Sequence, residues 1–205
     1  MVITQIKNKK ANKFEIYVDG EFWGYMHPET IAENLVKEGK EYSGEDLDYL
    51  KSVSQTKLAK ERALYLITYR DHSKKELITK LKQDYDELIC YQVADKMENI
   101  GFINDENYAR KLAHDLILVK KMGKRGAIYK MTQKGIDKDL AQECIDEIDI
   151  DPVEQLIEVI KRKYTRYLND QKGIAKISNA FLRQGHSYSD VKSALSACIS
   201  DFDQD

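Results

Sequence analysis

The sequence has few of the residues that interrupt helices, with two prolines and ten glycines among 205 residues. It has no run of about eighteen apolar residues, which is the length that a membrane-spanning helix requires. Its first ten residues, MVITQIKNKK, lack the apolar stretch of a secretory signal peptide. These absences favour a mostly helical globular protein that is cytoplasmic and does not enter a membrane.

The sequence also lacks a pattern for disulfides or for zinc. Its three cysteines, Cys90, Cys144 and Cys198, are far apart, and neither a CxxC nor an HxxxH spacing occurs. Each cysteine lies among apolar residues with helical spacing, so we expect three buried thiols in a reducing compartment. The sequence therefore predicts no metal site.

No catalytic motif is recognisable either. The four histidines are scattered, and none belongs to a nucleophile motif: His27, His72, His114 and His186. The stretch KKMGKRG at 120–126 lacks the preceding strand and the GK[ST] ending of a phosphate-binding loop. We therefore expect a protein that is not an enzyme and that needs no cofactor.

Charge is nearly balanced overall but unevenly distributed along the chain. Lys and Arg number 33, Asp and Glu number 35, and the net charge of −2 disfavours a protein that simply coats DNA. Basic residues prevail in segments 56–82, 105–135 and 153–183, and acidic residues prevail in the segments that follow them, 83–104, 136–152 and 184–205. This alternation, with a period near fifty residues, indicates a repeated unit with a basic opening and an acidic close.

The N-terminal segment has the pattern of a small sheet. VITQIK, FEIYV and EFWGYM are rich in β-branched and aromatic residues, and Asp19-Gly20 between the last two is a strong hairpin signal. Pro28 then begins a predicted helix that Gly39 closes, and a further helix begins near Ser43. We predict an N-terminal region, residues 1–53, made of an antiparallel β-meander and two helices.

From Ser54 onward the apolar spacing is helical throughout. Gly135 and Gly185 align at an offset of 50, and Leu77 and Ile128 align at an offset of 51. We predict a mostly α-helical protein with three tandem three-helix repeats, which form an elongated curved body. The predicted repeats span residues 54–103, 104–150 and 151–205.

Caps and apolar stripes define the helices within each repeat. Ser73 with Glu76 has the spacing of a capping box, and Asn104-Asp105 provides two good N-cap residues at the start of the second repeat. Leu88, Ile89, Val93 and Met97 are predicted to share one buried helix face. Among the tyrosines we expect Tyr65, Tyr108 and Tyr129 in the core, and Tyr69, Tyr164 and Tyr167 available to stack on a partner.

With these elements in place, the sequence resembles the RecX family, bacterial regulators of the RecA recombinase. Three stretches carry the resemblance: Ala63–Leu66 with Arg70 and Ser73–Leu77, Ile103–Asp105 with Tyr108–Arg110, and Lys134–Ile136. It is strong over residues 55–148 and weak in the third repeat, where GHSYSDV is one residue longer than the matching GIDKDL.

The resemblance implies a regulator that binds the RecA filament on single-stranded DNA. It implies inhibition of strand exchange, ATP hydrolysis and co-protease activity by a protein that lodges in the filament groove. The RecA filament is therefore the expected partner, single-stranded DNA is a second candidate, and we expect a monomer.

Basic clusters near the helix turns are the candidate binding residues. They are Arg70, Lys74 and Lys75 in the first repeat, Lys120, Lys121, Lys124 and Arg125 in the second, and Lys161, Arg162, Lys163 and Arg166 in the third. Stacked repeats would place them along one side, facing a phosphate backbone or an acidic protein groove. The alternative interpretation is that these side chains only keep helical surfaces solvated.

Two other functions remain open from the sequence. One is a helical-repeat protein that binds DNA or RNA directly, because three-helix units resemble helix-turn-helix modules. The other is a protein-interaction scaffold unrelated to recombination. Binding to bare single-stranded DNA, compared with binding to the same DNA coated with recombinase, separates these functions.

Overall fold

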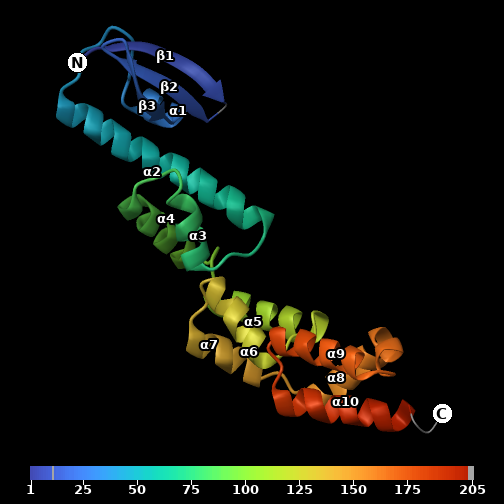
Figure 1. Cartoon of the computed structure of the whole chain (residues 1–205). Coiled ribbons are helices and arrows are strands. Elements are labelled where there is room, and N and C mark those ends of the chain that lie inside the picture. The colour runs from blue at the N-terminus through green and yellow to red at the C-terminus, as the bar shows by residue number, and fades with distance from the viewer. Residues whose placement is uncertain (11, 203–205) are drawn as a thin grey trace. The chain divides into compact units, whose positions relative to one another are not determined.

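The computed structural model describes residues 1–10 and 12–202 and contains two compact units, Met1–Ile103 and Asn104–Asp205 (Figure 1). The division falls where the sequence places the start of the second repeat. The first unit holds the three-stranded sheet and one three-helix repeat, and the second unit holds two further repeats. The predicted mostly helical fold with an N-terminal antiparallel sheet is confirmed.

The sheet is a meander of β1 (Ile3–Lys10), β2 (Lys13–Val18) and β3 (Glu21–Met26). Its strands lie in the order β1-β2-β3, and both pairs are antiparallel. Asp19 and Gly20 turn the chain between β2 and β3 with φ of 50° and 90°, which Asp and Gly tolerate best.

The helix predicted between Pro28 and Gly39 is shorter than expected. Helix α1 (Pro28–Glu33) ends early, and Leu35 takes a left-handed φ of 48°. The following residues instead pair with the open edge of β1, where Gly39 N donates to Ile3 O at 2.8 Å. The prediction was wrong because helical spacing does not account for the unpaired backbone groups at the edge of β1. These groups need hydrogen-bond partners, and residues after α1 supply them.

Helix α2 (Gly44–Tyr69) is continuous through the boundary that the sequence suggested at residues 53 and 54. Ser43 caps it with a complete capping box, as its sequence favours. Ser54, the first residue of the predicted first repeat, lies inside the helix, where its hydroxyl accepts a hydrogen bond from His27 N at 2.7 Å. The two predicted helices are therefore one, which packs its first half on the sheet and its second half in the first repeat.

The first repeat consists of the end of α2, α3 (Lys74–Leu81) and α4 (Glu87–Asn99). Ser73 caps α3 by accepting from Glu76 N at 3.0 Å, as predicted. The prediction for Leu88 was wrong, because its side chain is 65% exposed and Cys90 occupies the core instead. A stripe that already contains Cys90, Val93 and Met97 turns the position of Leu88 toward solvent.

The second repeat consists of α5 (Asp105–His114), a π-helical turn η1 (Asp115–Val119), α6 (Lys124–Gln133) and α7 (Lys138–Asp146). Of the two candidate caps, Asn104 is the N-cap, and its side chain accepts from Asn107 N at 2.8 Å. Asp105 is the first residue of the helix.

The third repeat consists of α8 (Pro152–Lys163), a 3-10 turn η2 (Thr165–Tyr167), α9 (Gln171–Arg183) and α10 (Tyr188–Phe202). Each repeat surrounds an apolar cluster of its own. One cysteine lies in each cluster, which confirms the expected burial of Cys90, Cys144 and Cys198.

The second and third repeats meet through glycine backbone. A Cβ placed on Gly126 would lie 2.2 Å from Gln184 O, and one on Gly185 would lie 2.0 Å from Gly126 N. Gly123 N also donates to Gln184 O at 3.2 Å. Because no side chain fits here, the start of α6 lies directly against the turn that follows α9.

We expect Asn104→Ala to lower the free energy of unfolding by about 1 kcal/mol, because it removes the N-cap hydrogen bond of α5. Glu106→Ala is the matched control, since this exposed residue makes only a 3.8 Å ion pair with Arg110 and should cost less than about 0.5 kcal/mol. Denaturant unfolding measures both values, and an equal loss in the two variants would refute the role of Asn104.

We expect Gly126→Ala to destabilise the protein by about 2 kcal/mol, because the new methyl group would overlap the carbonyl of Gln184. A loss of stability would be informative, because alanine is otherwise favoured over glycine within helices by about 1 kcal/mol. Gly44→Ala is the control, because its Cβ would meet only Met1 Cε at 3.5 Å. Thermal unfolding that showed Gly126→Ala to be as stable as the parent would disprove the close contact.

Candidate functional site

The structure offers neither a membrane span nor a metal site among residues 1–10 and 12–202. No helix there combines the length and the apolar composition needed to cross a bilayer. No group of three or more His, Cys, Asp or Glu side chains gathers there in a metal-binding arrangement. The candidate functional residues are therefore the basic side chains that the sequence singled out.

In the first repeat, two of the three predicted basic residues are paired with acids of the same unit. Arg70 Nη2 lies 2.6 Å from Glu76 Oε1. Lys74 Nζ lies 2.7 Å from Asp95 and 2.6 Å from Glu98, and hydrogen bonds to these carboxylates, Asp95 foremost, raise the pKa of Lys74 to about 12. Lys75 is exposed and makes no ion pair among the residues that the structure describes.

The second repeat contains the same ion pair at the matching place. Lys124, the first residue of α6, lies 2.9 Å from Asp146 at the end of α7, and this bond lowers the pKa of Asp146. Lys74 is likewise the first residue of α3, and Asp95 lies in the second half of α4. The alternation between basic and acidic segments along the chain thus partly reflects ion pairs that join the second helix of a repeat to its third helix.

Three further predicted residues are paired around the turn between η1 and α6 and along α8. Lys120 bonds to Asp115, and Lys121 Nζ lies 3.1 Å from Glu158 of the third repeat. Arg162 lies 3.9 Å from the same Glu158. These basic residues are largely neutralised within their own unit, so they have less charge to offer to a partner.

The remaining predicted residues lie on the surface of the second unit. Arg125 is exposed in the first turn of α6, and Lys161 and Lys163 are exposed in the last turn of α8. Arg166, in η2, is also exposed and lies over the Tyr167 ring, 4.9 Å from its centroid. In the described part of the chain, Arg125, Lys163 and Arg166 make no ion pair with an acidic side chain.

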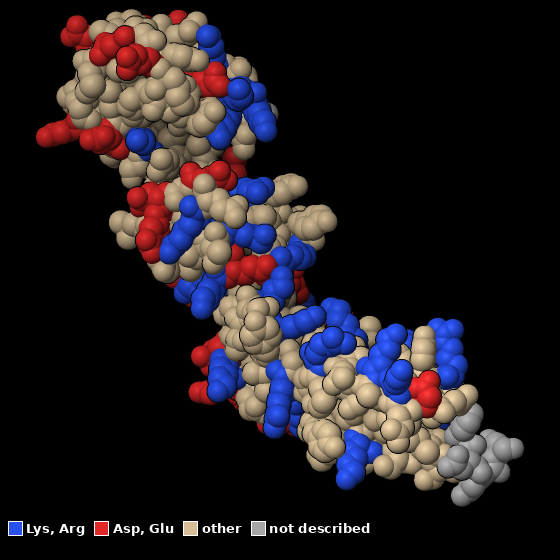
Figure 2. Space-filling model, viewed as in Figure 1, with Lys and Arg blue, Asp and Glu red and all other residues tan. Residues whose placement is uncertain are grey.

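A face of α9 adds basic residues that the sequence analysis missed. Lys172, Lys176, Asn179 and Arg183 line a shallow exposed depression along this helix. The opposite face packs Ile177 and Phe181 into the core. Helix α9 contains no Asp or Glu, so its cations have no acidic neighbour on the same helix. Figure 2 shows Lys and Arg gathered on this side of the second unit.

The signal for the α9 face was present in the sequence. No acidic residue occurs between Asp170 and Asp190, one of the two longest such gaps in the second half of the chain; the other lies between Asp115 and Asp137. The basic clusters were expected at the turns between helices, whereas Lys172, Lys176 and Arg183 follow one helix at intervals of four and seven residues.

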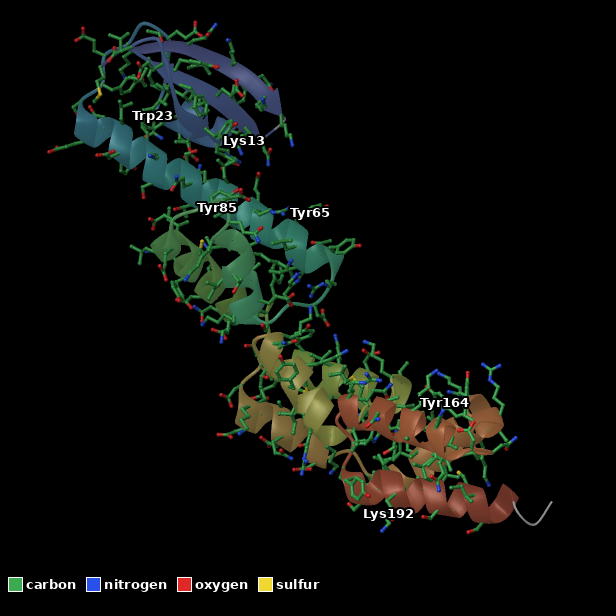
Figure 3. All side chains as sticks on the ribbon, viewed as in Figure 1. Lys13, Trp23, Tyr65, Tyr85, Tyr164 and Lys192 are labelled. Carbon is green, nitrogen blue, oxygen red and sulfur yellow. The ribbon has the colours of Figure 1, made fainter. Side chains whose placement is uncertain are left out.

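Four tyrosines differ from their predicted burial. Tyr65 and Tyr129, expected in the core, are each 64% exposed, whereas Tyr108 is partly buried against the core of the second repeat. Tyr164 and Tyr167, expected to be available, pack against the core of the third repeat. Figure 3 labels Tyr65 on the outer part of α2 and Tyr164 close to α9. The apolar body of tyrosine fits helical stripes, but its hydroxyl lets the same residue face water.

The glycine contact joins two groups of unpaired cations within the second unit. It places the end of α9, which carries Arg183, against the start of α6, which carries Arg125. We use the name "cationic surface" for the exposed residues of these helices and of η2 that make no ion pair in the described chain: Arg125, Lys130, Arg166, Lys172, Lys176 and Arg183. Such a set is suited to several phosphate or carboxylate groups at once.

We expect Lys124→Glu to destabilise the protein by about 1 kcal/mol more than Arg125→Glu. Lys124→Glu replaces the ion pair with Asp146 by repulsion between two carboxylates. Arg125→Glu breaks no ion pair in the described chain. Both positions lie in the first turn of α6, so each new glutamate gains the same favourable interaction with the helix N-terminus. Equal unfolding free energies in the two variants would contradict a structural role for Lys124.

Comparisons with known proteins give a consistent result. Family models described as the first and second three-helix domains of RecX match residues 59–97 and 104–145. A protein of Streptococcus pneumoniae strain CGSP14, named regulatory protein RecX, is 30% identical over 100% of this chain and 80% of its own length. One of Clostridioides difficile strain 630 with the same name is 28% identical over 99% and 98%.

Two solved structures show the same fold. A crystal structure of regulatory protein RecX aligns with a TM-score of 0.63 and 20% identity over 98% of both chains. The crystal structure of RecX from Lactobacillus salivarius aligns with a TM-score of 0.61 and 24% identity, over 75% of this chain and 99% of its own.

Proposed function

The chain belongs to the RecX family of regulatory proteins, and from this premise we propose that it binds the filament of the RecA recombinase on single-stranded DNA. Binding restrains strand exchange, ATP hydrolysis and co-protease activity. The protein acts in the cytoplasm as a monomer, by contact alone, without catalysis or a cofactor.

The observation that carries this proposal is the cationic surface of the second unit. Its residues make no ion pair with acids in the described chain, so their charge is available to a partner, unlike that of Lys74 or Lys124. A filament on DNA offers both phosphates and protein carboxylates, repeated along its length. Contacts that are individually modest then add together, because the second contact forms at a high effective concentration.

The other predicted basic residues have smaller roles in this proposal. Lys75 and Lys163 are exposed and supplement the cationic surface, and Lys161 is exposed beside them at the end of α8. The paired Arg70, Lys120, Lys121 and Arg162 mainly stabilise the local structure. An exposed ion pair is worth less than about 1 kcal/mol, so a strong anionic partner can still recruit these side chains.

The alternative is direct binding to DNA or RNA without the recombinase. The absence of acids from both α6 and α9 favours this alternative, since two neighbouring helices then present only positive charge. The acidic α7 and the net charge of −2 oppose it. Filament binding accommodates both features, because a filament presents charges of both signs.

The test is a triple reversal, Lys172→Glu, Lys176→Glu and Arg183→Glu, in an assay of the recombinase's DNA-dependent ATP hydrolysis. We expect half-inhibition to need at least about tenfold more protein, because the contact becomes repulsive. The control reverses Lys10, Lys37 and Lys96, which are exposed cations of the first unit without ion pairs in its described residues. Inhibition by the parent should also weaken as salt rises.

Two results would refute the proposal. One is equal inhibition by the reversal variant and the parent at every salt concentration, which would leave the cationic surface as a solvated face. The other is equal affinity for bare and recombinase-coated single-stranded DNA, which would favour direct nucleic-acid binding. Circular dichroism of each variant confirms that the fold is intact.

A further inference from the structure

A pocket of about 210 Å³ lies within the first unit, between the sheet, α2 and the turn that joins α3 to α4. Aromatic rings from β3 and from this turn line it: Trp23, Tyr25 and Tyr85. Polar side chains from β2, α2 and the turn complete the lining: Lys13, Lys51, Gln55 and Asp84. Figure 3 labels Lys13 and Trp23 near the sheet and Tyr85 near α2. Apolar walls with a few polar groups are typical of pockets that bind small molecules.

The position of Trp23 follows from an irregularity in the sheet. Ile16 of β2 pairs with Gly24 of β3. The next residue of β2, Tyr17, pairs with Phe22, so Trp23 is an extra residue without a partner on β2. A β-bulge of this kind changes the direction of a side chain, and bulges are frequent beside functional sites. Trp23 packs only partly on the core beneath the sheet, and it lines the pocket as well.

Several polar groups of the pocket have no hydrogen-bond partner in the described chain. They are the indole N–H of Trp23, the side-chain amide of Gln55 and the hydroxyl of Tyr85. All three side chains are half-buried, so a ligand in the pocket can still contact them. Burial, together with the neighbouring Asp84 carboxylate, raises the pKa of Tyr85, so its hydroxyl keeps its proton at neutral pH. The pocket therefore offers hydrogen bonds that its own chain does not use.

Two lysines at the pocket make no ion pair with a described acid. Lys51 Nζ lies 5.9 Å from the centroid of the Trp23 ring, and Lys13 Nζ lies 3.9 Å from that of Tyr25. Such cation–π contacts are weak at exposed sites, whereas charge-assisted hydrogen bonds to phosphate are strong. Both ammonium groups are therefore available to an anion beside the pocket. Asp84 is the one acid among the described residues of the lining.

We propose that this pocket binds one unpaired nucleobase that carries an amino group, while Lys13 and Lys51 hold the adjoining phosphates. The base stacks on Trp23, since every base has a π-face that an aromatic side chain can contact. Pockets for drug-sized ligands measure about 300 Å³ or more, so this smaller pocket suits a single ring system and excludes a base pair. The base comes from a single strand or from a free nucleotide, which share the ring and the phosphate.

Asp84 determines which bases the pocket prefers. A carboxylate accepts a hydrogen bond from the exocyclic amino group of cytosine, and adenine and guanine also carry amino groups. Thymine has a ring of the same size as cytosine, but it presents a carbonyl oxygen where cytosine has its amino group. This oxygen repels the carboxylate of Asp84. Cytosine should therefore bind more tightly than thymine, although the two rings stack on Trp23 with similar area.

This site does not rest on the filament contact proposed for the cationic surface. The pocket belongs to the first unit, and the cationic surface belongs to the second. The pocket contacts a single nucleotide, so its test needs no recombinase. Failure at one site therefore leaves the proposal for the other intact.

Trp23 makes the test direct, because it is the single tryptophan of the chain. Its fluorescence changes when a base stacks on the ring, and selective excitation separates it from the tyrosines. Short oligo(dC) and oligo(dT) strands and deoxycytidine 5′-monophosphate are titrated separately into the full chain at low salt. We expect saturable quenching, with oligo(dC) bound about tenfold more tightly than oligo(dT), which corresponds to one hydrogen bond to a charged group. Weaker binding of the mononucleotide identifies the strand as the source of the base, and equal binding identifies the free nucleotide.

Variants of the polar residues assign the contacts while Trp23 stays in place as the probe. The double change Lys13→Gln and Lys51→Gln should weaken oligo(dC) binding at least about tenfold, because two phosphate contacts are lost. Lys40→Gln is the matched control, since Lys40 Nζ also lies over a ring, 5.0 Å from the Tyr42 centroid, but does not line the pocket. Asp84→Asn should equalise oligo(dC) and oligo(dT), because an amide both donates and accepts hydrogen bonds.

Three results would overturn the proposal. The first is the absence of a saturable change in Trp23 fluorescence with millimolar oligo(dC), which would leave the pocket to water. The second is equal affinity of the parent for oligo(dC) and oligo(dT). The third is an equal loss of affinity in Lys40→Gln and in the double variant, which would show general attraction between the strand and surface cations.

Discussion

The second unit depends on one close contact between two stretches of backbone. A Cβ on Gly123, Gly126 or Gly185 would lie between 2.0 and 2.2 Å from a backbone atom of the other stretch. Backbone can approach backbone this closely only where both sides lack side chains. The contact fixes where α6 begins relative to the end of α9, and it leaves α6 without a capping side chain. It also brings the start of α6, with Arg125, against the end of α9, with Arg183.

Internal neutralisation decides which of the many basic residues can act on a partner. Lys74 and Lys124 begin equivalent helices and bond to acids near the ends of the third helices of their repeats. The third repeat has no such pair among its described residues, and its middle helix carries no acid at all. The repeats thus differ: Lys74 and Lys124 serve internal cohesion, whereas Lys172, Lys176 and Arg183 of α9 make no ion pair with a described acid.

The first unit is organised by a shared helix rather than by a linker. Helix α2 contributes Leu47 and Leu50 to the core beneath the sheet, and Ala59 and Ala63 to the core of the first repeat. His27 strengthens this connection, because its ring caps α1 and lies 3.0 Å from Glu61 of α2. The sheet therefore cannot shift against the first repeat without breaking a helix.

The sequence by itself determined the class of fold, the hairpin at Asp19-Gly20, the cap at Ser73 and the burial of the three cysteines. These features depend on neighbours within a few residues or on helical spacing, so the local pattern is sufficient. The recurrence of basic residues was also visible in the sequence. Whether each of them is paired with an acid or available to a partner was not. Charge in a sequence says nothing about whether an acid from another helix lies within reach.

Only the tertiary structure decided that α1 ends before Leu35, that α2 continues through Ser54 and that Leu88 faces water. In the first two cases the partner is distant in the sequence: the edge of β1 for the end of α1, and His27 for Ser54. In the third case Cys90, two residues away on the same helix, takes the core position. Residues 123, 125 and 186 likewise come together only in the folded chain, because glycines far apart in the sequence permit the two stretches of backbone to touch.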